Sequence, residues 1–220
     1  ESNTRDSIYN AFRRKETFAT TGSRIKVRFF AGYDIENALN EEDPIAFAYS
    51  KGVTMGSDIL ESDGRAPSFL VWALRDIKRA PLDRVQIIKG WTEISGRTYE
   101  KVFDVACSWG IAPDPATNRC SNNGAKVNLD NCEISKNVGS NELKTIWKDP
   151  EFDPSIKAFY YVRVLENPTC RWSTWDALKS GNKPRADVTP TIQERAWSSP
   201  IWYVPNNLGF TAVNILPDDL

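Results

Sequence analysis

The chain has 220 residues, of which 40% are hydrophobic, so it is long enough and apolar enough to form a buried core. Its 28 basic and 29 acidic residues nearly cancel, which argues against a nucleic-acid partner or an anionic membrane. No apolar run approaches the roughly 20 residues that cross a bilayer, so we expect no membrane insertion. Histidine is absent, and histidine-based catalysis or metal binding would therefore have to lie outside this chain.

The first segment is predicted to be a surface helix. Residues 4–15 place Ile8 and Phe12 on one helical face, and this is the only helix that the pattern predicts. The β-branched stretch 17–21 ends at Gly22 and predicts a strand followed by a turn. Because Glu1 falls within what reads as the middle of a helix, we expect the chain to be a fragment of a longer protein.

The rest of the chain is predicted to be β-structure. Apolar and polar residues alternate over 25–30, as in a half-buried strand. Further strands are predicted at 45–49, 69–74, 84–88, 99–106, 143–147 and 158–165. Such spacing is typical of an antiparallel β-sandwich. Segment 69–74 is apolar on both faces, which predicts a central strand in a sheet covered on both sides. Long connections are expected at 31–44, 107–141 and 166–191.

The cysteines at Cys107, Cys120, Cys132 and Cys170 are disulfide candidates. None forms a CxxC pair and none has a histidine nearby, so a zinc site is disfavoured. The polar stretch 107–132 can bury little apolar surface, and a covalent link would compensate by restricting the unfolded chain. We therefore expect an oxidising compartment. Three pairings are open, and a buried free thiol is an alternative chiefly for Cys170.

Tryptophan is unusually frequent, with eight residues in the chain. Trp72 and Trp147 fall in predicted strands and are assigned to the core. Trp172 and Trp175 lie in the connection 166–191 and are the one pair that we expect to be exposed. Exposed tryptophan rings can stack on sugars, although such a pair more often packs at a domain interface.

Six sequence blocks occur in an order that resembles the C-terminal third of the bacterial family catalogued as domain of unknown function 3604. The blocks are RRKETFATTGSRIKVRFFAGYD, KGVTMGSDI, RAPSFLVWALRD, PLDRVQIIKGW, DPEFDPSIKAFYYVRVLENPT and TIQERAWSSPIWYVP. The resemblance implies a larger protein whose N-terminal part is similar to the polymerase and histidinol phosphatase (PHP) superfamily of metal-dependent barrels. By this resemblance the divalent metal ion belongs to that N-terminal barrel portion, and the present chain carries no cofactor.

The resemblance also implies a division of the chain. Residues 1–22 would be the terminal helix and strand of the truncated barrel, 23–205 a β-sandwich domain with a disulfide-rich loop at 107–141, and 206–220 a C-terminal tail. The expected fold class is therefore mainly β: an antiparallel β-sandwich with a short N-terminal helix-strand remnant of a preceding α/β barrel. The N-terminal barrel portion would be the partner of the sandwich.

Few residues suggest chemistry directly. Glu194 and Arg195 are candidate catalytic residues because their segment would face the barrel, but an Arg-to-carboxylate pair that fixes the last strand to the barrel is the preferred interpretation. Thr21, Gly22 and Arg24 could hold a phosphate or sulfate oxygen at the end of a barrel strand. Alternatively, Gly22 supplies only a turn and Arg24 only pairs with an acid.

The function expected from these observations is that of the C-terminal β-sandwich portion of a metal-dependent, phosphoesterase-like hydrolase, inactive by itself. The alternative is a non-catalytic glycan- or protein-binding module that uses Trp172, Trp175 and the disulfide-rich loop. A third possibility is a purely structural domain. In each case we expect a periplasmic or secreted bacterial protein. The sequence leaves the substrate, the metal, the disulfide connectivity and the oligomeric state open.

Overall fold

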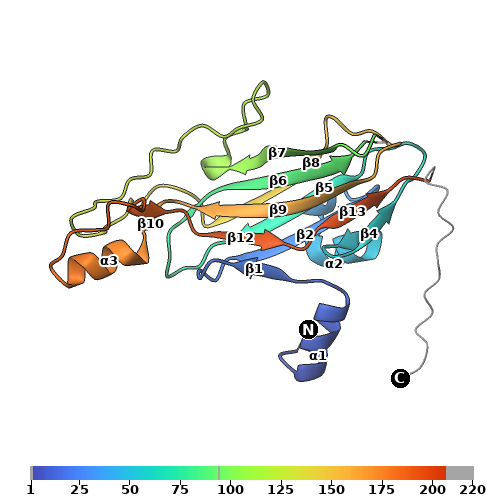
Figure 1. Cartoon of the computed structure of the whole chain (residues 1–220). Coiled ribbons are helices and arrows are strands. Elements are labelled where there is room, and N and C mark those ends of the chain that lie inside the picture. The colour runs from blue at the N-terminus through green and yellow to red at the C-terminus, as the bar shows by residue number, and fades with distance from the viewer. Residues whose placement is uncertain (1, 94, 207–220) are drawn as a thin grey trace.

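The computed structural model describes residues 2–93 and 95–206, which form two packed β-sheets and three short helices (Figure 1). The first sheet contains β1 (Phe18–Thr20), β4 (Asp58–Leu60), β6 (Leu82–Thr92), β7 (Thr98–Cys107), β9 (Ala158–Glu166), β12 (Arg195–Ser198) and β13 (Ile201–Val204). The second contains β2 (Lys26–Gly32), β3 (Val53–Thr54), β5 (Ser68–Leu74) and β8 (Glu142–Lys148). The predicted antiparallel β-sandwich is therefore confirmed, and it includes a short N-terminal helix and strand.

Strand β9 is the centre of the first sheet. One edge of β9 pairs with β6, which in turn pairs with β7. The other edge is shared by two successive strands, because β12 pairs near Leu165 and β13 pairs near Tyr160. Strand β1 extends the sheet antiparallel to β12, and β4 extends it parallel to β13. The N-terminal strand and the last described strands thus lie side by side.

The core lies between the two sheets. Alternate residues of β9 point inward, including Tyr160 and Val162, and they meet Phe69 and Val71 of β5. The opposite face of β5 is also buried, because Leu70 packs in a second apolar cluster beneath a helix. This confirms the prediction that 69–74 forms a strand covered on both sides.

The predicted strand at 45–49 is wrong, because this segment lies in helix α2 (Pro44–Lys51). Asp43 caps the helix: its Oδ1 accepts hydrogen bonds from the backbone amides of Ile45 at 3.1 Å and Ala46 at 3.0 Å. Pro44 occupies the first turn, where its missing N–H costs nothing. The apolar run reads like a strand because α2 buries residues such as Ala48 against the outer face of the second sheet.

The expected connection 166–191 also contains regular structure. It holds α3 (Trp172–Lys179) and a small two-stranded sheet of β10 (Thr169–Cys170) and β11 (Thr191–Ile192). Two 3-10 helices, η1 (Ala38–Asn40) and η2 (Ser108–Gly110), complete the described elements. Figure 1 shows α3 and β10 at one end of the sandwich, where the long loop between β7 and β8 also arrives.

The predicted N-terminal helix is confirmed as α1 (Arg5–Arg13), capped by Thr4. It does not pack against the sandwich along its length, and none of its residues is buried. Ile8 is 48% exposed and Phe12 is 65% exposed. No helix in the described part of the chain is long and apolar enough to cross a membrane. The expected C-terminal tail at 206–220 lies, except for its first residue, outside the described residues.

Candidate functional site

Two disulfides fix the long loop between β7 and β8. Cys107 pairs with Cys120, and Cys132 pairs with Cys170, the last residue of β10. The prediction of disulfides is confirmed, and the alternative of a free thiol at Cys170 is wrong. The second disulfide joins the far end of the loop to β10. Such bonds persist in oxidising compartments, and they indicate an extracytoplasmic protein.

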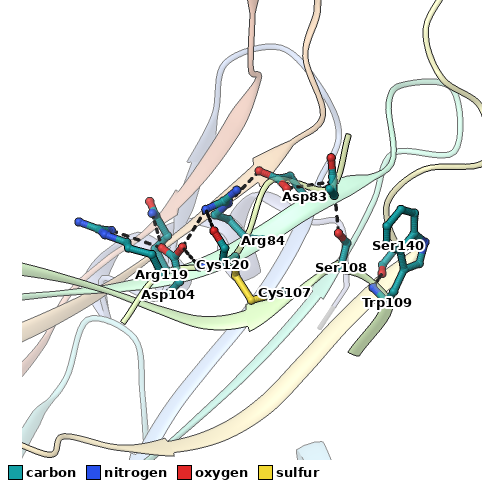
Figure 2. Close-up of a disulfide and its surroundings, with 11 residues drawn as sticks. Asp83, Arg84, Asp104, Cys107, Ser108, Trp109, Arg119, Cys120 and Ser140 are labelled. Carbon is teal, nitrogen blue, oxygen red and sulfur yellow. Dashed lines mark hydrogen bonds and ion pairs between the residues drawn. A yellow bond between two sulfur atoms is a disulfide. The ribbon is translucent and has the colours of Figure 1, made fainter. Parts of the chain in front are cut away.

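The first disulfide lies beside a buried carboxylate, that of Asp104 (Figure 2). Arg84 Nη1 donates to Asp104 Oδ2 at 2.8 Å, and the backbone amide of Cys120 donates to the same oxygen at 2.7 Å. Gln86 Nε2 donates to Oδ1 at 2.6 Å. Arg84 also donates to the carbonyl oxygen of Cys120 at 3.2 Å. Asp104 therefore holds the loop against β6 and β7.

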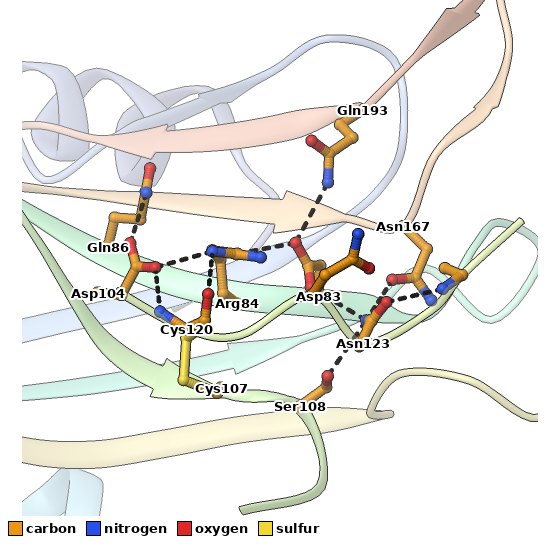
Figure 3. Close-up of polar contacts among 12 residues, drawn as sticks. Asp83, Arg84, Gln86, Asp104, Cys107, Ser108, Cys120, Asn123, Asn167 and Gln193 are labelled. Carbon is orange, nitrogen blue, oxygen red and sulfur yellow. Dashed lines mark hydrogen bonds and ion pairs between the residues drawn. A yellow bond between two sulfur atoms is a disulfide. The ribbon is translucent and has the colours of Figure 1, made fainter. Parts of the chain in front are cut away.

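Asn123 makes a second attachment of the loop (Figure 3). Its Nδ2 lies 3.0 Å from Asp83 Oδ1, 2.8 Å from Asn167 Oδ1 and 3.2 Å from Ser108 Oγ. Gln193 Nε2 reaches Asp83 from the other side at 3.2 Å. The polar groups of this network pair with one another, so we assign it a structural rather than a chemical role.

A pocket of about 510 Å³ opens beside this loop, at the end of the sandwich that carries α3. Five separate segments line it: 21–23, 78–80, 132–136, the strand β10 with α3, and Glu194. The Cys132–Cys170 disulfide is part of its wall. A volume of this size is within the range of small-ligand sites in proteins, roughly 300–1,000 Å³.

The pocket brings together most of the site residues that the sequence suggested. Thr21, Gly22, Trp172, Trp175 and Glu194 all line it. Pairing between β1 and β12 is responsible, because the turn after β1 is held against the residue that follows Glu194. The amide of Arg195 donates to Thr21 Oγ1 at 2.9 Å, and Thr21 N donates to the Arg195 carbonyl at 3.0 Å.

Arg24 and Arg195 are not among the lining residues. Arg24 uses its backbone amide, which donates to Asp76 Oδ2 at 2.9 Å. The Arg195 guanidinium donates to the Gln193 carbonyl at 3.2 Å and lies over the Trp197 ring. Glu194 forms no ion pair with any described residue, and the suggested Arg-to-carboxylate pair that would fix the last strand to a barrel stays a prediction.

Two lining residues, Ser23 and Glu194, and the neighbouring Glu166 have buried side-chain oxygens that meet no hydrogen-bond geometry in the described part of the chain. They are Ser23 Oγ, both carboxylate oxygens of Glu166, and Oε2 of Glu194. Glu166 is 0% exposed. Burial raises its pKa to about 7; the nearby Ser23 hydroxyl and Arg79 oppose this rise, while the negative charges of Asp76 and Glu194 add to it.

Three cations at the pocket were missed by the sequence reading: Lys78, Arg79 and Lys136. Within the described residues, none of the three side chains takes part in a hydrogen bond or ion pair. Lys78 and Arg79 lie in a turn that follows β5, and Lys136 lies in the disulfide-pinned loop. Isolated lysines in polar segments carry no local signal, so only the folded arrangement identifies them.

A separate ion pair is buried on the other side of the molecule. Lys89 Nζ lies 2.5 Å from Asp149 Oδ2 and donates to the Glu151 carbonyl at 2.7 Å. The Tyr160 hydroxyl donates to Asp149 Oδ2 at 2.8 Å, and burial beside this carboxylate raises the pKa of Tyr160. In the described residues, no group of three or more Cys, Asp or Glu side chains is placed to hold a metal ion.

The fold and the pocket together define a disulfide-pinned β-sandwich module with a candidate ligand site at one end. A family model described as "Protein of unknown function (DUF3604)" matches residues 1–205, and the chain belongs to this family. No curated protein and no solved structure matches the chain.

Proposed function

We propose that this chain is the non-catalytic C-terminal β-sandwich portion of a periplasmic or secreted metal-dependent hydrolase of the phosphoesterase-like type. In this proposal the catalytic divalent metal ion belongs to an N-terminal PHP-like barrel portion of the same protein. The similarity of the six sequence blocks supports the assignment of the hydrolase class. The sandwich would support the barrel and contribute no metal ligand, so the chain by itself would be inactive.

The observation that carries the proposed domain contact is the exposed apolar face of α1. Ile8 and Phe12 are one helical turn apart, and both are about half exposed or more. Phe18, in the strand after the helix, lines a further apolar pocket of about 490 Å³ together with Ile45 and Trp72. Exposed apolar side chains on a helix, together with an apolar pocket beside the following strand, are suited to packing against another domain.

The attachment of α1 to the sandwich is short and specific. Glu16, just after the helix, accepts hydrogen bonds from Tyr49 and, at 3.2 Å, from Thr54 Oγ1. At Gly56 a Cβ atom would lie 2.3 Å from the carbonyl oxygen of Lys15, so the backbones approach too closely for a side chain. One end of α1 is thus fixed, while its apolar face stays available to a barrel domain.

The test uses the full-length protein with the substitutions Ile8→Ser and Phe12→Ser combined. The wild type is expected to contain tightly bound divalent metal, to hydrolyse a phosphate ester, and to unfold in one thermal transition. The double variant should separate the unfolding of the two domains and lower activity. Ile77→Ser is the matched control, because Ile77 is exposed on a turn elsewhere. A metal-free native protein that consists of this sandwich alone would refute the proposal.

A further inference from the structure

The two exposed tryptophans of α3 lie on one side of the pocket. Trp172 and Trp175 are three residues apart, so they share a helical face, and both line the pocket. Trp172 is 73% exposed and Trp175 is 41% exposed. Lys179 lies over the Trp175 ring, with Nζ 5.8 Å from the ring centre. The Cys132–Cys170 disulfide fixes the backbone two residues before α3, so the helix that carries both tryptophans is anchored at the pocket wall.

The pocket wall also carries a carboxylate that the described protein leaves without a hydrogen bond. Glu194 lines the pocket, and its Oε2 is buried without a partner. Ser23 lines the pocket too, but its hydroxyl faces the Glu166 carboxyl. Buried polar groups are normally paired, so a ligand hydroxyl group that reaches the Glu194 carboxylate would satisfy it.

The pocket wall carries an excess of positive charge. Lys78, Arg79 and Lys136 lie at the pocket without hydrogen bonds or ion pairs in the described part of the chain, and they outnumber the two lining acids, Glu133 and Glu194. The chain as a whole carries a net charge of −1, so this concentration of cations is local. It is suited to a carboxylate or sulfate group on the ligand.

We propose that the pocket binds a pyranose unit that carries a carboxylate or sulfate group, as in an acidic polysaccharide. Trp172 and Trp175 stack against the apolar face of the sugar ring, and the C–H groups of that face contact the indole rings. Glu194 binds a hydroxyl group of the sugar, and the three cations bind its acidic substituent. A flat protein interface would not need a concave pocket lined by an unpaired carboxylate.

This proposal goes beyond the supporting role proposed above and does not depend on it. Its test is isothermal titration calorimetry of the chain itself with three probes: an oligogalacturonate, which carries carboxylates only, a κ-carrageenan oligosaccharide, which carries sulfates only, and a neutral cello-oligosaccharide. We expect saturable binding of at least one acidic probe, weakened by added salt, and much weaker binding of the neutral one. Comparison of the two acidic probes distinguishes a carboxylate from a sulfate preference.

Matched variants assign the binding to the pocket. Trp175→Ala is expected to weaken binding by about tenfold or more, whereas Trp109→Ala, which removes an exposed tryptophan outside the pocket, leaves it unchanged. Lys136→Gln is expected to weaken binding about threefold to tenfold and to reduce its salt dependence. Lys126→Gln, in the same loop but outside the pocket, is the control. Circular dichroism establishes that each variant is folded.

Three results would overturn the proposal: no saturable binding of either acidic probe, equal affinity for the neutral probe, or equal loss of binding in the Trp109 and Trp175 variants. None of these results bears on metal content or hydrolysis in the full-length protein. Conversely, a full-length protein without metal leaves the sugar-binding result intact.

Discussion

Replacement of Glu166 by Gln should remove a pH dependence of folding stability. The Glu166 carboxyl is fully buried, and its pKa is raised from the ordinary glutamate value of 4.5 to about 7. Because the folded state holds this proton more tightly than the unfolded state, the stabilisation is complete below about pH 4.5 and is lost as pH rises through 7. Each pKa unit is worth about 1.4 kcal/mol, so the loss between pH 5 and 8 is about 2–3 kcal/mol.

The assay is urea unfolding of the oxidised chain at pH 5, 6, 7 and 8, for the wild type, Glu166→Gln and the exposed control Glu41→Gln. Wild type and control should share one pH profile. For Glu166→Gln, the free energy of unfolding should depend less on pH. Relative to the wild type, the variant should gain about 2–3 kcal/mol of unfolding free energy between pH 5 and pH 8. Parallel profiles for all three proteins would show that Glu166 does not change its protonation over this range, and the reasoning would fail.

Three further predictions concern the framework. Replacing Cys132 and Cys170 together by Ser should cost about 3–4 kcal/mol of stability, because the disulfide closes a loop of 38 residues. Thermal unfolding measures this loss, and an unchanged melting temperature would contradict the prediction. Asp149→Asn should cost about 3–5 kcal/mol in urea unfolding because it leaves a buried lysine charge without its partner; a cost under 1 kcal/mol would argue against a desolvated pair. Asp104→Asn should release the loop 107–141 and increase its cleavage by protease, and equal cleavage rates would refute the anchoring role.

The strands were predictable where burial imposes a period of two or a continuous apolar run. Segments such as 69–74 and 158–165 are strands because their inward residues form the core between the sheets. The strand predicted at 45–49 was wrong for a physical reason, because a short helix that packs on a sheet is as apolar as a buried strand. The deciding signal was Asp43 followed by Pro44, which together cap and start a helix.

The sequence identified several individual residues of the candidate site, but it could not show that they lie together in one pocket. Trp172 and Trp175 were expected to be exposed, and the expectation is confirmed. Their approach to Thr21 depends on pairing between strands whose contacting residues are 174 positions apart, and on a disulfide whose partner the sequence left open. Long-range pairing of this kind has no local signature. The cations of the pocket were missed for the same reason.

The two disulfides attach the long loop between β7 and β8 to the sandwich at fixed points. They separate a loop segment whose sequence and length can change from the sheets, which must keep their packing. Apart from Asn123, the residues between Cys120 and Cys132 make no hydrogen bond to the sheets in the described part of the chain. The free-energy cost of lengthening a loop grows only logarithmically with its length. Insertions there would leave the sheets intact while reshaping the pocket wall near Lys136. Members of the family could therefore diverge in ligand preference by exchanging this one segment, with the same sandwich inherited unchanged.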